Sequence, residues 1–125
     1  MRKALLFEDE ESCRTVMIDI LKEYDIEVDA YPDPTLYFKK SDKCPNVDVI
    51  LTDHQMPNMT GLDFLKRIDE MRCDIPPDNK AVISGGLTDN DITKIEELGI
   101  KCFHKPCSID EIYDWLNEIG VIPKH

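Results

Sequence analysis

Asp53 is the residue of this chain best placed to do chemistry. It follows the largely apolar run 47–51 and precedes a turn that contains Pro57 and Gly61. A short apolar run bounded by turn residues is typical of a buried strand, so the Asp53 carboxylate should stand at a strand tip. A carboxylate held there can act as a nucleophile or as a metal ligand.

Two further acids end another apolar run, because Glu8 and Asp9 follow residues 4–7. Ligands of an open parallel sheet bind beyond the carboxyl ends of its strands. If the first and third strands are neighbours, Glu8, Asp9 and Asp53 share one crevice. Like charges at that range require a cation or a raised pKa, and a hard divalent ion such as Mg²⁺ would relieve the repulsion.

A lysine and a hydroxyl complete the predicted site. Lys105 follows the apolar run 100–103, and Ser84 ends the run 81–83. The ammonium group can neutralise one phosphoryl oxygen, while the hydroxyl can donate a hydrogen bond to another. The combination predicts a metal-assisted site at which Asp53 accepts a phosphoryl group.

Strand-like and helix-like segments alternate along the whole chain. The predicted strands cover 4–7, 26–31, 47–53, 81–84 and 100–103, and amphipathic or capped segments predict helices at 11–24, 35–40, 61–71, 89–98 and 109–119. This alternation predicts a doubly wound α/β fold, with a parallel sheet covered by helices on both faces. The alternating pattern of 26–31 favours an edge strand.

Length and charge limit the classes of function. The chain has 125 residues, which fits a single domain, 1–125, with no effector domain. Its 26 acidic and 15 basic residues give a net charge of −11, which disfavours binding to nucleic acid or to an anionic membrane. No leader or spanning segment is evident, so we expect a soluble, cytoplasmic protein.

The five cysteines are odd in number and scattered. Neither a disulfide framework nor a zinc ribbon has such spacing, so we expect reduced thiols. Cys102, His104 and Cys107 are near neighbours, but no second ligand cluster accompanies them, and a metal site there is disfavoured.

The motifs, taken together, resemble the receiver domain of two-component response regulators, the CheY-like superfamily. The resemblance rests on Glu8-Asp9, the acceptor segment 53–61, Ile83-Ser84-Gly85 and Lys105-Pro106, and it covers essentially the whole chain. It implies a flavodoxin-like sheet of five parallel strands in the order 2-1-3-4-5, flanked by five helices.

The resemblance also implies roles for individual residues. Asp53 would be the phospho-acceptor. Asp9, Asp53 and the backbone carbonyl of Gln55 would bind Mg²⁺, with Glu8 acting through water. Ser84 and Lys105 would contact the phosphoryl group, and Lys105-Pro106 would be a cis peptide.

Several further positions near the site bear on signalling and on dephosphorylation. Receivers usually carry an aromatic residue three positions before the lysine, but here that residue is Cys102, while Phe103 should point to the opposite side of its strand. Gln55 and Gly86 occupy the positions that flank the attacking water in this family. His54 should look away from Asp53 toward solvent.

We therefore predict a stand-alone receiver that accepts a phosphoryl group from a histidine kinase or phosphotransfer protein and signals by a conformational change and protein contact. By resemblance, the output surface lies within residues 89–119, and the downstream partner is unknown. Apart from its own phosphorylation and dephosphorylation, such a protein is not an enzyme. The alternatives are a haloacid-dehalogenase-like Mg²⁺-dependent phosphatase, whose second acid would stand where Gln55 is, and a degenerate receiver that only binds partners.

Overall fold

The computed structural model describes residues 2–122, in which strands and helices alternate. The strands are β1 (Arg2–Phe7), β2 (Ile26–Tyr31), β3 (Val49–Asp53), β4 (Lys80–Ser84) and β5 (Lys101–His104). The helices are α1 (Glu11–Glu23), α2 (Pro34–Lys40), α3 (Gly61–Glu70), α4 (Asp89–Leu98) and α5 (Ile109–Glu118), with a 3₁₀ turn at Pro77–Asn79. Every predicted element is present.

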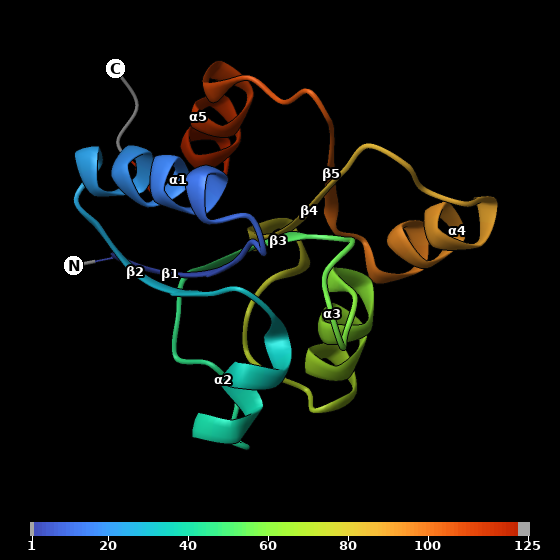
Figure 1. Cartoon of the computed structure of the whole chain (residues 1–125). Helices are drawn as coiled ribbons and strands as arrows, with labels where there is room; N and C mark the ends of the chain where they lie inside the picture. Colours follow the sequence, from blue (N-terminus) through green and yellow to red (C-terminus); the bar gives the residue numbers. More distant parts are fainter. Residues whose placement is uncertain (1, 123–125) are drawn as a thin grey trace.

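The strands form one parallel sheet in the order β2-β1-β3-β4-β5, which confirms the predicted topology and the edge position of β2 (Figure 1). β3 begins two residues later than predicted. The physical reason lies at Asp48, whose side chain accepts the Lys3 N–H at 2.8 Å, a hydrogen bond that a strand would reserve for a backbone carbonyl.

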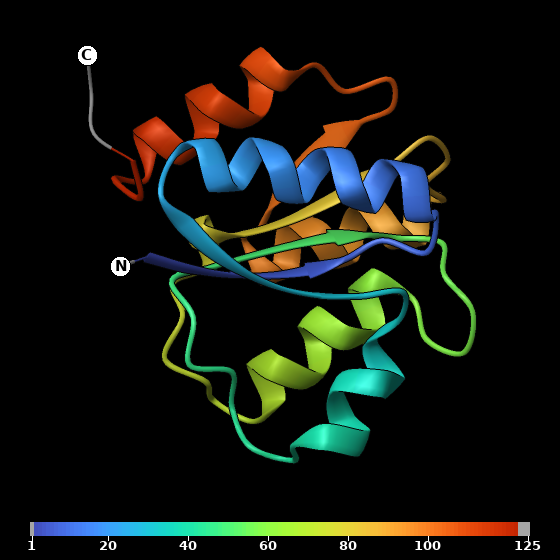
Figure 2. The same ribbon diagram turned by 60° about the vertical axis from the view of Figure 1, so that its left-hand side comes forward.

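Helices cover both faces of the sheet, with α1 and α5 on one face and α2 and α3 on the other (Figure 2). The α1/α5 side encloses a core that includes Leu21, Phe103, Ile112, Trp115 and Leu116. The opposite core includes Phe7, Tyr37, Phe64, Leu65 and, from α4, Ile95. Burial on both faces explains why the middle parts of the central strands are almost entirely apolar.

Local signals set the ends of several helices. Asp33 accepts the Thr35 N–H at 2.7 Å and caps α2, whose first residue is Pro34, as the sequence predicts. Ser108 and Glu111 form the predicted capping box at α5. Gly99 ends α4 in the left-handed conformation, with φ of 68°.

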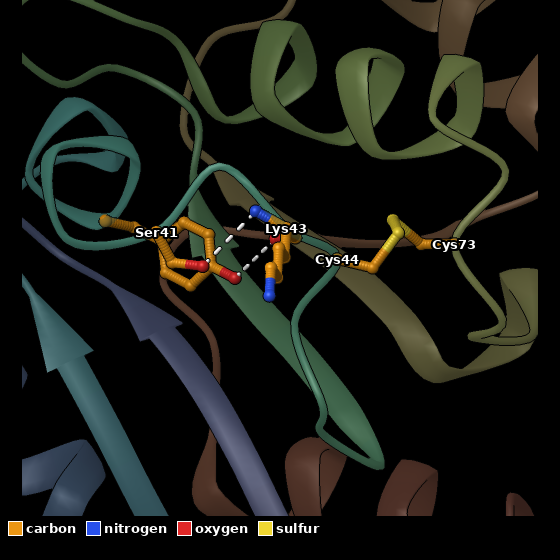
Figure 3. The surroundings of a disulfide bond; sticks show 5 residues. Ser41, Lys43, Cys44 and Cys73 are labelled. Atoms are coloured by element: carbon orange, nitrogen blue, oxygen red, sulfur yellow. Dashed lines mark hydrogen bonds between the residues drawn. A yellow bond between two sulfur atoms is a disulfide. The ribbon is translucent and has the colours of Figure 1, made fainter.

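The expectation that all five thiols are reduced is wrong. Cys44 and Cys73 form a disulfide with a Cα–Cα distance of 5.4 Å (Figure 3). Cys44 lies before β3 and Cys73 before β4, so the pairing of these two strands brings the preceding loops together. Beside the bridge, the Tyr37 hydroxyl donates to the Lys43 carbonyl at 2.9 Å.

Cys13, Cys102 and Cys107 are free thiols. Among residues 2–122, the groups whose ligand atoms could share a metal ion do not include the Cys102, His104 and Cys107 set. Within the same range, no helix is long and apolar enough to cross a membrane. The predicted domain 1–125 includes Met1 and residues 123–125, which lie outside the described residues.

Candidate functional site

The phosphoryl acceptor predicted from the sequence lies at the carboxyl end of β3, in the middle of the sheet. Asp53 is buried, with 6% of its surface exposed. Its Oδ1 accepts the backbone N–H of His54 at 2.9 Å and lies 3.2 Å from Nζ of Lys105. The carboxylate is therefore oriented by one neutral donor and one cation.

The acidic pair lies beside Asp53 because β1 and β3 are neighbours, with Phe7 in register with Thr52. Glu8, Asp9 and Asp53 each offer an oxygen atom, and these three atoms lie within 4.8 Å of one another. Glu8 is buried and Asp9 is exposed. The crowding that the sequence predicted at this edge is present.

Burial and the negative charge of Asp53 raise the pKa of Glu8 to about 7. The Glu10 N–H, which donates to Glu8 Oε1 at 3.2 Å, only partly offsets this effect. Arg14 also reaches the segment, donating to the Glu8 carbonyl at 2.8 Å, a contact that sequence reasoning missed. A carboxyl destabilised by a neighbouring carboxylate is the situation that a bound divalent cation would relieve, so the donor set fits Mg²⁺.

Lys105 and Ser84 meet at the ends of β5 and β4. The Lys105 N–H donates to the Ser84 carbonyl at 3.0 Å, and Lys105-Pro106 is a cis peptide, as the resemblance implied. Partial burial lowers the pKa of the Lys105 ammonium, but contacts with Asp53 and the charge of Glu8 outweigh this, and the net shift is upward. Lys105 is therefore a cation at neutral pH.

The Ser84 side chain points into its own loop. Its hydroxyl donates to the Gly86 carbonyl at 3.2 Å and accepts the Gly86 N–H at 3.1 Å. The hydroxyl nevertheless lies at the edge of an open hollow of about 460 Å³. The hollow is lined by Asp9, Asp53, Gln55, Ser84, Gly85, Gly86 and Lys105, which brings together most of the predicted site residues.

The turn after Asp53 folds back against its own strand. The Gly61 N–H donates to the His54 carbonyl at 2.9 Å. A Cβ atom at Gly61 would collide with the Asp53 carbonyl oxygen and lie 2.9 Å from Oγ1 of Thr52. Only glycine permits this close approach, which places Gln55 at the rim of the hollow.

The structure shows where the side chains of Cys102, Phe103 and His54 lie. Cys102 packs on the α3/α4 side of the sheet, whereas Phe103 is buried on the α1/α5 side, as strand alternation predicts. The expectation that His54 faces solvent is wrong. Its side chain is 8% exposed and lies against Asp91 of α4, at 3.4 Å between Nε2 and Oδ2.

The model of the response regulator receiver domain family matches residues 4–117. The chain belongs to this family. Receiver domains are signalling phospho-acceptors of two-component systems that bind Mg²⁺ at an acidic pocket and take their phosphoryl groups from histidine kinases or phosphotransfer proteins. Phosphorylation on an aspartate is characteristic of them.

Individual relatives agree with this assignment. A protein-glutamate methylesterase/protein-glutamine glutaminase of Methylobacillus flagellatus is 38% identical over 72 residues, which is 56% of this chain. The match spans only 20% of that relative's length.

Solved receivers share the fold. The Vibrio cholerae chemotaxis protein CheY4 superposes with a TM-score of 0.76 at 23% identity, covering 95% of this chain and 98% of that one. A DNA-binding response regulator of the LuxR family from Staphylococcus aureus gives a TM-score of 0.79 at 24% identity, with 96% and 99% covered.

Proposed function

We propose that this receiver takes a phosphoryl group from a histidine kinase or phosphotransfer protein onto Asp53. The observation that carries the proposal is the 3.2 Å contact between Lys105 Nζ and Asp53 Oδ1 in a hollow that also contains acidic residues. This arrangement pairs a carboxylate nucleophile with a cation that can neutralise an incoming phosphoryl oxygen.

Asp53, Lys105 and Ser84 supply the groups that the phosphoryl transfer needs. A carboxylate oxygen of Asp53 forms a bond to phosphorus while the phosphorus–nitrogen bond of the donor phosphohistidine breaks, and the nitrogen keeps the bonding electrons. Lys105 moves from the carboxylate toward a phosphoryl oxygen. Ser84 exchanges its hydrogen bond with the Gly86 carbonyl for one to another phosphoryl oxygen.

Mg²⁺ would be held by Asp9, Asp53 and the backbone carbonyl of Gln55, with Glu8 acting through water. When bound, it neutralises charge on the transferring group. The raised pKa of Glu8 supports this assignment, because three crowded carboxyl groups need a cation to ionise together.

The phosphatase alternative is less well supported. Such a phosphatase would carry its second acid at position 55, which is Gln55 here. The chain also belongs to a family of signalling phospho-acceptors. A degenerate receiver is disfavoured because Asp9, Asp53, Ser84 and Lys105 all line the hollow. We propose a cytoplasmic protein whose output is contact with another protein, at α4, β5 and α5, rather than with nucleic acid or membrane, in keeping with the charge of −11.

Incubation with acetyl phosphate and Mg²⁺ tests the proposal. The wild-type protein should gain an acid-stable, base-labile phosphoryl label, and Asp53→Asn should not. Asp19→Asn, which changes an exposed acid on α1, is the matched control and should label normally. Absence of label on the wild type, or equal labelling of Asp53→Asn, would reject Asp53 as the acceptor.

A further inference from the structure

His54 links the acceptor strand to α4 by its side chain. The imidazole is buried, and its Nε2 lies 3.4 Å from Oδ2 of Asp91. Within residues 2–122, its other ring nitrogen, Nδ1, is buried without a hydrogen-bond partner. The contact with Asp91 is therefore the polar interaction that holds the ring in place.

The backbone of the same residue contacts the acceptor directly. The His54 N–H donates to Asp53 Oδ1 at 2.9 Å and to the Ile83 carbonyl at 3.1 Å. A change in the charge or position of Oδ1 therefore acts on the residue whose side chain holds α4.

Asp91 is positioned to pass on a displacement of the ring. It is the third residue of α4, and its Oδ2, the atom nearest His54, also accepts the Thr88 N–H at 3.0 Å. The Thr88 hydroxyl in turn accepts the Asp91 N–H at 3.1 Å, completing a capping box. A single carboxylate oxygen thus joins the first turn of α4 to the acceptor strand.

The rest of α4 is less firmly held. Ile95 is its only buried residue, and the side of the helix at Ile92 is 42% exposed. The β4–α4 loop begins with Gly85 and Gly86. Cys102, three positions before Lys105, packs a small side chain on the α3/α4 side of the sheet.

We propose that His54 is a positioning residue that couples the state of Asp53 to the position of α4 through Asp91. This inference rests on the proposed phosphoryl acceptance by Asp53. Phosphorylation changes the carboxylate that accepts the His54 N–H, the imidazole shifts relative to Asp91, and the first turn of α4 follows. The coupling is reciprocal, so breaking the contact at α4 changes the affinity of Asp53 for a phosphoryl mimic.

The test uses beryllofluoride with Mg²⁺ as the phosphoryl mimic and NMR amide shifts as the readout. In the wild type, beryllofluoride should shift the α4 amides of residues 89–98. In His54→Leu and in Asp91→Ala these shifts should be largely lost, and the apparent affinity for beryllofluoride should change by about fivefold or more. The double variant should resemble either single variant, because both remove one contact.

Glu111→Ala is the matched control. Glu111 holds the same third position in the capping box of α5 but is exposed and far along the chain from the acceptor turn. It should leave both the α4 shifts and the affinity unchanged, which separates loss of a cap from loss of the His54 contact. If His54→Leu does not fold, Asp91→Ala carries the same expectation, since Asp91 does not line the hollow.

The outcomes distinguish the two proposals. A wild-type protein that does not respond to beryllofluoride argues against the proposed function. A wild-type protein that responds, with variants whose α4 shifts and affinity match it, overturns the coupling and leaves the function standing. Equal effects of Glu111→Ala and Asp91→Ala would also overturn it.

Discussion

Lys105 reaches across β4 to place its Nζ 3.2 Å from Oδ1 of Asp53. Lys105 follows β5 and Asp53 ends β3, so their meeting depends on the order of the strands in the sheet. This contact joins residues from β3 and from the end of β5, and Ser84 ends the strand β4 that lies between them.

Lys105→Met should slow phosphorylation of Asp53 by acetyl phosphate by about 10²-fold, because it removes a positioned cation from the transferring group. The measurement is the initial rate of label incorporation. Lys66→Met is the control, since Lys66 is exposed on α3 and its nearest acid, Glu70, lies 4.0 Å away. A rate for Lys105→Met equal to that of the control would show that the cation has no role in transfer.

Glu8→Gln should stabilise the metal-free protein at pH 8. The folded-state pKa of Glu8 is raised from 4.5 to about 7, so the folded protein holds this proton more tightly than the unfolded chain. Stability is therefore lost as pH rises from 4.5 through 7, and the loss is complete above that range. The amide should recover roughly 3 kcal/mol at pH 8 and much less at pH 4.

Denaturant unfolding in a chelator at both pH values measures this effect. Adding Mg²⁺ at pH 8 should raise the stability of the wild type, because the ion offsets the repulsion among Glu8, Asp9 and Asp53. The interpretation fails if Glu8→Gln gives the same change in stability at pH 4 and pH 8.

Gly61→Ala should destabilise the fold by about 1–3 kcal/mol, because the new Cβ collides with the Asp53 carbonyl. Gly86→Ala offers a matched comparison, since a Cβ there meets no atom within 4 Å. Thermal unfolding of both variants measures the difference. Similar midpoints for the two variants would mean that the turn relaxes without cost.

Cys44→Ser should lower the free energy of unfolding by about 3.5 kcal/mol under oxidising conditions, because the bridge closes a loop between residues separated by 29 positions. Cys13→Ser alters an exposed free thiol and should have little effect. Chemical denaturation measures both. Non-reducing peptide mapping should find Cys44 joined to Cys73, and a map with both thiols free would contradict the pairing.

Local sequence patterns predicted most of the fold. The run of apolar residues before Asp53 predicted β3, and the Asp33-Pro34 pair predicted the start of α2. Strand ends were predicted less accurately, as β3 shows: the Asp48 N–H pairs with the Lys3 carbonyl, but the Lys3 N–H pairs with the Asp48 side chain instead of a backbone carbonyl. That choice depends on a partner, Lys3, that is distant in the sequence.

Two of the contacts that sequence reasoning missed have the same cause. Cys44 and Cys73 precede the adjacent strands β3 and β4. His54 follows β3, and Asp91 lies in α4, the helix that follows β4. In each case the two residue types can pair chemically, but they stand at different distances from their strands. Predicting these contacts required the strand order and the tilt of the flanking loops and helix.

The sequence alone predicted which residues gather at one edge of the sheet, because Glu8, Asp9, Asp53, Ser84 and Lys105 each end or follow a strand and parallel strands end at one edge. Only the tertiary structure decided which distant side chains meet beyond that edge. It buried His54 against Asp91 and joined Cys44 to Cys73, because packing of helices and loops on the sheet, not local pattern, sets those distances.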